Sequence, residues 1–303
     1  MITVFGSLNV DYVFQVPALP APGETLLATN MVVLPGGKGG NQALAAARAG
    51  ATVHMAGAVG DDGLGHIAIA GLLADGVNTE AVALSEQPTG TASINVDRDG
   101  ENAIVVFAGA NADASHAQLA HTGLEKGGLL LLQMEIPVGE MAQAIGYAKE
   151  ISAKIIWNLA PMQSVEIELL RQVTVLVVNE IELVQLGLHL GLPESDDTAS
   201  LLSNVAQQTR NSVVLTLGAK GCLADHHGEQ IAIPALPVSP IDTVGAGDAF
   251  CGAFAAALDA GEPFSTALRW GCVAGSLACL KTGAQTALPS REEIAAHLPA
   301  LPA

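Results

Sequence analysis

The sequence predicts a three-layer α/β/α fold with a mostly parallel central sheet and a small projecting β-sheet. Half of the 303 residues are hydrophobic and only 3% are aromatic. The core should therefore consist mainly of Ala, Val, Leu and Ile, which fill parallel sheets and the helices that cover them. Short β-branched or Leu-rich runs also alternate with Ala-rich amphipathic stretches, which is typical of an α/β protein. The length favours one domain, residues 1–303, with an appendage.

The buried strands of the central sheet are expected where the short apolar runs occur, at residues 2–6, 53–59, 129–134, 154–158, 174–178 and 212–217. Helices are expected at residues 41–48, 140–151, 198–209, 248–259, 266–280 and 292–297. The last helix follows Ser290, and Glu293 stands three residues later, which is the spacing of a capping box.

Residues 25–34 and 91–107 break this alternation and are typical of exposed antiparallel strands. The second segment has a turn signal at Asp97-Arg98-Asp99-Gly100. Together they predict a lid, a small sheet with strands from about residues 12–34 and 89–108, which projects from the main layer and covers a site. Residues 221–233 predict another hairpin with His226-His227-Gly228 at its tip. We expect that tip to be a solvated turn, because two adjacent His side chains cannot easily bind one metal ion.

The charge excludes one class of partner. Twelve Lys and Arg residues stand against 30 Asp and Glu residues, and the net charge of -18 has the wrong sign for neutralising nucleic-acid phosphates. An anionic nucleotide would need a metal counterion or a locally positive backbone site in such a protein.

The sequence also predicts a cytoplasmic protein without a membrane segment. Met1-Ile2-Thr3-Val4-Phe5-Gly6 has no basic region followed by a long apolar stretch, so no secretory signal is expected. The run at residues 129–132 is far shorter than the roughly 20 residues of a membrane span. The four cysteines form no CxxC pair and are expected to be free thiols, mostly buried, in a reducing compartment: Cys222, Cys251, Cys272 and Cys279.

A loop of small residues precedes one of the Ala-rich helices, in Asp242-Thr243-Val244-Gly245-Ala246-Gly247-Asp248. The backbone N–H groups of Gly245, Ala246 and Gly247 would be unobstructed there, and the helix dipole would add partial positive charge. The sequence therefore predicts an anion-binding cradle. A carboxylate such as Asp248 can also simply cap a helix start.

A second glycine-rich loop, Gly36-Gly37-Lys38-Gly39-Gly40-Asn41-Gln42-Ala43, also opens a helix. Two unrelated turns of this composition are less plausible than one site built from both. Neither loop is a P-loop or a dinucleotide fingerprint, because Gly39 follows Lys38 and Phe250 stands where a third glycine would be needed.

These two loops resemble the two signature regions of the PfkB carbohydrate kinases. Shorter matches resemble the ribokinase group within that family, and the likeness runs from the first strand to Gly283-Ala284-Gln285. The shorter matches are Asn9 and Asp11 in Gly6-Ser7-Leu8-Asn9-Val10-Asp11, then Gln133-Met134-Glu135, Asn179-Glu180-Ile181-Glu182 and Thr216-Leu217-Gly218-Ala219-Lys220-Gly221.

The resemblance implies ATP-dependent phosphorylation of a sugar primary hydroxyl, with D-ribose converted to ribose 5-phosphate. Asp248 would accept the hydroxyl proton, and Gly245, Ala246 and Gly247 would form an anion hole for the moving phosphoryl group. A weak base is sufficient, because proton removal comes late in a loose transition state.

The resemblance also implies the residues of a sugar pocket. Their carboxylates and amides suit recognition of several hydroxyls, and we expect them in one cleft at strand ends and helix starts. Each also has a structural alternative as a strand end, a helix cap or a solvated side chain. They are Asn9, Asp11, Gly37, Lys38, Asn41, Glu135 and Asp248.

For the nucleotide, the resemblance implies ATP contacts from Asn179, Thr216, Gly218 and Gly221, with Lys220 facing solvent. Glu182 would organise Mg²⁺ through water, which suits an ion that keeps several waters. A monovalent cation such as K⁺ would lie near Asp242, Val244 and Gly283. The sequence departs from the family pattern here, since Thr286-Ala287 stands where a Ser is expected, and this leaves the cation requirement open.

Two other functions stay open. A kinase for another sugar or a nucleoside would reuse the same cradle and base, although the scarcity of aromatic residues weakly disfavours a nucleobase pocket. A non-catalytic sugar-binding regulator on the same fold is the other, although it would be expected to lose the base or the cradle. The resemblance further implies a homodimer formed through the lid.

Overall fold

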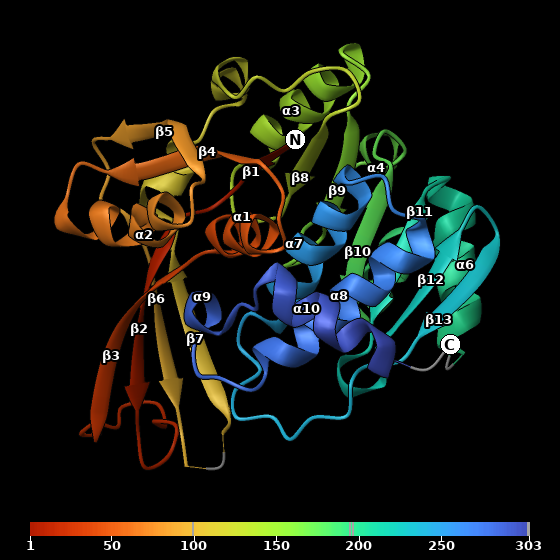
Figure 1. The fold of residues 1–303 in the computed structure, drawn as a ribbon. Coiled ribbons are helices and arrows are strands. Elements are labelled where there is room, and N and C mark those ends of the chain that lie inside the picture. The colour runs from red at the N-terminus through yellow and green to blue at the C-terminus, as the bar shows by residue number, and fades with distance from the viewer. Residues whose placement is uncertain (99, 194, 196, 302–303) are drawn as a thin grey trace.

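The computed structural model describes residues 1–98, 100–193, 195 and 197–301, and within them a nine-stranded sheet forms the central layer (Figure 1). Its order is β13-β12-β11-β10-β9-β8-β1-β4-β5. Neighbours from β11 to β5 pair in parallel, and β12 and β13 add an antiparallel hairpin at one edge. The strands are β1 (Ile2–Phe5), β4 (Val53–Gly60), β5 (Asn78–Ser85), β8 (Leu129–Leu132), β9 (Lys154–Asn158), β10 (Val175–Asn179), β11 (Ser212–Thr216), β12 (Cys222–His226) and β13 (Glu229–Ile233).

Helices cover both faces of this sheet, so the predicted three-layer class is confirmed (Figure 1). Alternate residues of the strands point to opposite faces. Ile2 and Val4 of β1 therefore join one apolar cluster, and Phe5 joins the other. The first cluster includes α1 (Lys38–Arg48), α2 (Gly63–Ala74), α7 (Ala246–Asp259), α8 (Phe264–Ala278) and α10 (Arg291–His297). The second includes α3 (Val138–Glu150), α4 (Ile167–Leu170), α5 (Glu180–His189) and α6 (Thr198–Thr209).

A separate four-stranded sheet of order β3-β2-β6-β7 projects from the main body (Figure 1). It consists of β2 (Asn9–Gln15), β3 (Asn30–Gly36), β6 (Gly90–Val96) and β7 (Asn102–Phe107). Strand β2 pairs antiparallel with β3 and parallel with β6, and β6 pairs antiparallel with β7. Of the turn expected between β6 and β7, Asp99 lies outside the described residues, while the Gly100 N–H donates to the Asp97 carbonyl.

The structure corrects several expectations. Asn9 and Asp11 lie inside β2 of the small sheet and not beyond a strand of the central sheet, because the chain passes directly from β1 into β2. Strand β5 and helices α2 and α5 were not expected. The tip of the β12–β13 hairpin is only partly solvated, because His226 stacks on Phe264 with ring centroids 3.9 Å apart while His227 is exposed.

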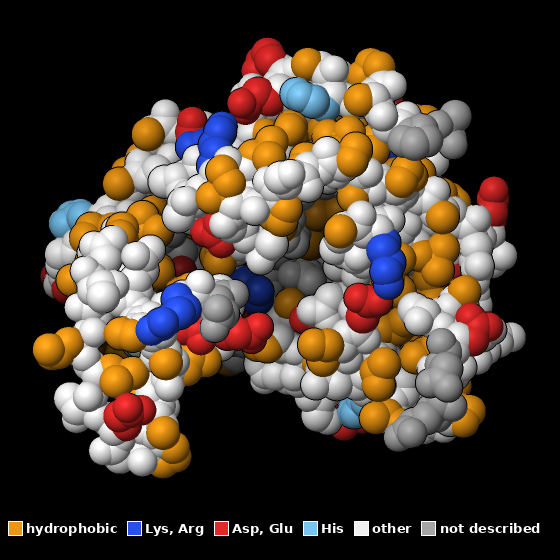
Figure 2. All heavy atoms as spheres, turned by 90° about the horizontal axis from the view of Figure 1, so that it is seen from below, with side chains coloured by type: hydrophobic (Ala, Val, Ile, Leu, Met, Phe, Trp, Pro, Cys, Tyr) orange, Lys and Arg blue, Asp and Glu red, His pale blue; other side chains and the backbone are white. Residues whose placement is uncertain are grey.

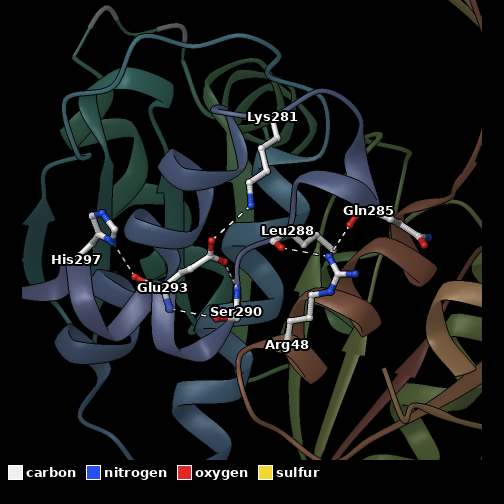
Figure 3. Close-up of polar contacts among 7 residues, drawn as sticks. All are labelled: Arg48, Lys281, Gln285, Leu288, Ser290, Glu293 and His297. Carbon is white, nitrogen blue, oxygen red and sulfur yellow. Dashed lines mark hydrogen bonds and ion pairs between the residues drawn. The ribbon is translucent and has the colours of Figure 1, made fainter. Parts of the chain in front are cut away.

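The C-terminal end of α1 is joined to the segment that carries α9 (Ala284–Ala287), as Figure 3 shows. Arg48 Nη1 donates to the carbonyls of Gln285 at 2.8 Å and Leu288 at 3.2 Å. The predicted capping box at the start of α10 is confirmed, with Ser290 and Glu293 bonded reciprocally. These contacts tie α9 to α1, and Ala284, the first residue of α9, lies against Gly245 at the N-terminus of α7.

Within the described part of the chain, no helix combines the length and apolarity that crossing a membrane requires.

Candidate active site

The N-terminal ends of α1 and α7 meet at Asp248. Its carboxylate is 7% exposed and accepts two hydrogen bonds, from Asn41 Nδ2 to Oδ2 and from Gln42 Nε2 to Oδ1, each at 2.9 Å. The two glycine-rich loops predicted to form one site are therefore adjacent. Figure 2 shows this face of the molecule hollowed between the projecting sheet and the main body, with a basic side chain inside and acidic side chains beside it.

The loop that opens α1 requires glycine. Gly37 has φ of 84°, and a Cβ there would lie 2.8 Å from the backbone nitrogen of Asn9. The side chain of Glu135 holds this loop, because its Oε2 accepts from the Lys38 N–H at 3.0 Å and from Ser7 Oγ at 2.6 Å. Glu135, expected in the sugar pocket, thus also caps α1, and no described residue donates a hydrogen bond to its Oε1.

Asn9 and Asp11 extend from β2 toward the same place. Asn9 is 3% exposed, and its Oδ1 accepts from Asn111 Nδ2 at 2.7 Å. The pKa of Asp11 is raised to about 7, chiefly by burial and then by the charges of Glu135 and Asp248. An acid in this position can accept hydrogen bonds from hydroxyl groups when ionised and donate one when protonated.

Lys38 is the cation among these carboxylates. The charge of Asp248 raises its pKa, burial opposes that effect, and Glu135 and Glu182 raise the pKa further. The carboxylates of Asp248, Glu135 and Glu182 therefore favour the charged form of this ammonium group. Such a charge is positioned to attract a phosphate group as well as a sugar hydroxyl.

The turn before α7 offers backbone N–H groups. Gly245 adopts the left-handed conformation, with φ of 77° and ψ of 0°, and a Cβ there would lie 2.8 Å from Ala284 Cα. In the described part of the chain, the N–H groups of Gly245, Gly247 and Asp248 have no hydrogen-bond partner. The N–H of Ala246 differs from expectation, because it donates to the Thr243 carbonyl at 3.3 Å. The helix start thus presents three free donors and the positive end of the helix dipole.

A cavity of about 530 Å³ extends from this turn. All four residues expected to contact ATP line it, as do Ala246 and Gly247: Asn179, Thr216, Gly218 and Gly221. The remaining wall is largely apolar, with Leu236, Pro237, Val238, Phe250 and Cys272. The cavity is therefore apolar where a flat base could lie and has backbone donors at one end.

Asn179 and Glu182 form a capping box at the start of α5. Asn179 Oδ1 accepts from the Glu182 N–H, and Glu182 Oε2 accepts from the Asn179 N–H, both at 2.8 Å. The oxygen of Asn179 is thus used by the helix. Glu182 is 7% exposed, and burial raises its pKa while the charge of Lys38 opposes this. No described residue donates a hydrogen bond to Glu182 Oε1, and a buried carboxylate with one such oxygen fits a divalent cation that keeps most of its waters.

The residues expected at a monovalent cation site are also brought together. Asp242 Oδ1 accepts from the Val244 N–H at 3.0 Å, and Oδ2 accepts from the Gly283 N–H at 2.8 Å. Lys220 is exposed as expected and lies 3.9 Å from Glu180. Among the described residues, no group of three or more His, Cys, Asp or Glu side chains could hold a metal ion by itself.

Residue patterns did not single out the buried amides around this site. Gln42, Gln133, Asn158 and Asn111 are all at most 8% exposed and bonded to expected site residues or to each other. Two of them nevertheless stand in motifs that resemble the family, Gln42 in the second glycine-rich loop and Gln133 in Gln133-Met134-Glu135, and Asn158 lies at the end of an apolar strand.

Comparison with known proteins adds a family match. The model of a family described as pfkB family carbohydrate kinase matches residues 1–291. A curated relative named ribokinase, from Bacillus subtilis, is 38% identical over 296 residues, which cover 97% of each chain.

Two solved structures are similar over nearly the whole chain. A ribokinase from Thermotoga maritima has a TM-score of 0.88 at 32% identity, covering 98% of this chain and 99% of the other. A ribokinase from Arabidopsis thaliana, solved with ribose and ATP, has a TM-score of 0.85 at 29% identity and covers 98% of each chain.

Proposed function

Because the chain belongs to the pfkB family of carbohydrate kinases and is a sugar kinase, we propose that it transfers the terminal phosphoryl group of ATP to the primary hydroxyl of D-ribose. The product is ribose 5-phosphate. One observation carries this proposal: the Asp248 carboxylate lies in the first turn of α7, next to the free N–H groups of Gly245 and Gly247. A base and an anion site are thus adjacent.

In the proposed reaction, the sugar hydroxyl oxygen forms a bond to the terminal phosphorus, and the bond from phosphorus to the bridging oxygen of ADP breaks. Asp248 accepts the hydroxyl proton as this bond forms. The transition state is loose, so the hydroxyl becomes acidic only as it attacks, and a carboxylate held at hydrogen-bond distance is a sufficient base.

The free N–H groups at the α7 N-terminus would stabilise the phosphoryl group in flight. They are Gly245, Gly247 and Asp248, and the α7 dipole adds to them. Such donors are fixed before the reaction begins, so they need no reorganisation when charge develops. The ammonium of Lys38, whose pKa is raised chiefly by the charge of Asp248, would add a positive charge near this carboxylate.

Ribose is proposed as the acceptor because the residues expected to bind the sugar are polar. Amides, carboxylates and an ammonium are offered by Asn9 and Asp11 of β2, by Lys38 and Asn41 of α1, and by Glu135 at the start of α1. Among the described residues, the buried Asn41 Oδ1 has no hydrogen-bond partner, so it is available to a ligand hydroxyl. The names of the relatives and the ribose and ATP in the Arabidopsis structure support the same acceptor and donor.

ATP would occupy the cavity next to α7, with its base against the apolar wall and contacts from Asn179, Thr216, Gly218 and Gly221. Glu182 would hold Mg²⁺ through water, and the ion would supply positive charge to the phosphate oxygens. Asp242, Val244 and Gly283 would surround a monovalent cation such as K⁺ just outside the anion site.

We further propose that the protein is a single-domain kinase (residues 1–303) whose small sheet is a lid and forms a homodimer in the cytoplasm. The face of this sheet that carries Asp11 continues into exposed apolar residues. Asp11 pairs with Ala92 and Ala92 with Val106, so Val106 and Ile104 lie on that face, 53% and 51% exposed. A partner lid would cover them, and closure would exclude water that could otherwise hydrolyse ATP. The four free cysteines agree with a reducing compartment.

The experiment is an ADP-release assay with ATP and Mg²⁺ across ribose, 2-deoxyribose, fructose, glucose and adenosine. The proposal predicts the highest kcat/KM with ribose. A higher kcat/KM with another sugar or with adenosine would identify that compound, and not ribose, as the substrate. Sugar binding measured by calorimetry without any turnover would favour a non-catalytic binding protein.

A further inference from the structure

We propose that Gln42 is a positioning residue that fixes the carboxylate of Asp248 for proton transfer, and that Gln133 and Asn158 hold Gln42 in the required orientation. The inference rests on the proposed role of Asp248 as the base. It concerns three buried amides for which the sequence predicted no role, although Gln42 stands in the second glycine-rich loop and Gln133 in the Gln133-Met134-Glu135 match.

Gln42 lies directly behind Asp248. It is 0% exposed, and its Nε2 lies 2.9 Å from Asp248 Oδ1 and 3.0 Å from Asn158 Oδ1. An amide nitrogen has two hydrogens, so both are used. Its Oε1 accepts from Gln133 Nε2 at 2.8 Å. All of the hydrogen-bonding groups of Gln42 except one oxygen lone pair are thus engaged inside the protein.

The orientation of the three amides follows from one backbone carbonyl. Asn158 Nδ2 donates to the Val177 carbonyl at 3.2 Å, so Asn158 must direct its oxygen toward Gln42. Gln42 must then direct its nitrogen toward Asn158 and Asp248. If the Gln42 amide were flipped, its oxygen would face the oxygens of both residues, and its nitrogen would face the Gln133 nitrogen. Burial makes such unpaired contacts costly, so a single arrangement is favoured.

This arrangement leaves the base competent. Asn41 holds Oδ2 of Asp248 and Gln42 holds Oδ1, so the plane of the carboxylate is fixed at both oxygens. Each carboxylate oxygen can accept about two hydrogen bonds, so each keeps a free position for a sugar hydroxyl. An amide N–H cannot give up its proton at neutral pH, and therefore the two donors orient Asp248 without competing for its role as proton acceptor.

Orientation of the base affects the chemical step more than ligand binding. Gln42 does not face the cavity expected to hold ATP, and it is shielded from the hollow by complete burial. Loss of its N–H would let the carboxylate rotate away from the attacking hydroxyl, and small errors in position lower rates by large factors. The expected signature is a lower kcat with little change in KM.

The test compares steady-state kinetics of the full-length chain with Gln42→Met, which preserves side-chain length and removes both donors. We expect kcat to fall by about 10- to 100-fold, with KM for ribose and for ATP changed by less than about threefold. Gln133→Met leaves the contacts from Gln42 to Asp248 and Asn158 in place but removes the donor that holds Gln42 Oε1, so a smaller fall of about 3- to 10-fold is expected.

Asn211→Leu is the matched control. Asn211 is another buried amide, 6% exposed, which donates to the Val173 carbonyl at 2.6 Å and makes no contact with Asp248. This variant should melt at a lower temperature but keep its kcat below that temperature. If Gln42→Met does not fold, the folded Gln133→Met variant tests the inference. Its kcat and KM are then compared with those of the wild type in the same way.

A kcat within twofold of the wild type in the folded variant would overturn the inference, and so would parallel changes of kcat and KM. Asp248→Asn separates this failure from a failure of the proposed function. If Asp248→Asn loses activity while Gln42→Met retains it, only the positioning role is wrong. If Asp248→Asn also retains activity, the proposed base is wrong and the role of Gln42 falls with it.

Discussion

Asn41 Nδ2 lies 2.9 Å from Oδ2 of Asp248, and this contact joins the start of α1 to the start of α7 across 207 positions of sequence. The first of these helices follows the loop expected to bind the sugar, and the second follows the turn expected to bind the phosphoryl group. A single carboxylate therefore lies between the two halves of the site.

Asp248→Asn should abolish most of the phosphorylation. The substituted amide cannot accept the hydroxyl proton, so kcat should fall by about 100-fold or more, while the Kd for ribose stays within a few fold of the wild type. Rapid-quench measurement of ribose 5-phosphate checks the fall in kcat, and calorimetric titration of ribose checks the Kd. Near-normal turnover would remove Asp248 from the role of base.

Gly247→Ala tests whether a phosphate approaches the bare backbone of α7. A Cβ at Gly247 would meet no other atom within 4 Å, so the fold should tolerate it and gain about 0.5–1 kcal/mol from the better helix former. The methyl group would nevertheless stand where the phosphoryl group must come, so kcat/KM for ATP should fall by at least about tenfold.

Gly139→Ala is the matched control, because Gly139 is also the second residue of its helix and also has open space around its Cβ position. It should show the same small gain in stability and unchanged kinetics. Equal kinetics for the two variants would place the anion site elsewhere.

Asp11→Asn should change how stability depends on pH. The pKa of Asp11 is about 7 in the folded protein against 3.8 ordinarily, so the folded state binds a proton more tightly than the unfolded state. The resulting stabilisation is complete below about pH 4 and is lost as the pH rises through about 7. Asn does not titrate, so the variant does not lose stability in this way. The urea midpoint of the variant minus that of the wild type should therefore be larger at pH 8 than at pH 5. A variant that is less stable by the same amount at both pH values would contradict the account.

Ile104→Asp tests the proposed dimer. The substitution would place a carboxylate on the exposed apolar face of the small sheet. This charge should not be buried against a partner unless it is neutralised. Sedimentation velocity should show a dimer for the wild type and a monomer for the variant, with a raised KM for ribose. Leu188→Asp, at a residue of α5 that is 51% exposed, should remain a dimer. A monomeric wild type would refute the proposal.

The central layer could be predicted because its strands are nearly continuous apolar runs, and the residues 154–158 predicted as a strand coincide with β9. Helix α2 was missed because its sequence, Gly63-Leu64-Gly65-His66-Ile67-Ala68-Ile69-Ala70-Gly71-Leu72-Leu73-Ala74, is apolar all round and interrupted by glycines. It therefore has no amphipathic period, even though only one face is buried. Strand β5 was missed because it combines buried and exposed residues at an edge without strict alternation.

Some features of the candidate site could likewise be predicted from the sequence, and others could not. Its glycines could be predicted because only glycine permits the positive φ of Gly37 and Gly245 and their close approach to other backbone. The roles of Asn111, Gln133 and Asn158 could not be predicted, because a neutral amide has no charge pattern or spacing that separates a buried network from a solvated surface. Likewise, the engagement of Glu135 by the Lys38 N–H depends on a contact between residues 97 positions apart.

The most direct test of the central claim is a crystal structure with ribose and a non-hydrolysable ATP analogue. We predict that the ribose primary hydroxyl lies within about 3 Å of an Asp248 carboxylate oxygen, and that the terminal phosphate accepts hydrogen bonds from the N–H groups of Gly245 and Gly247. A terminal phosphate bound away from this turn, with no contact to either glycine, would contradict the proposed chemistry.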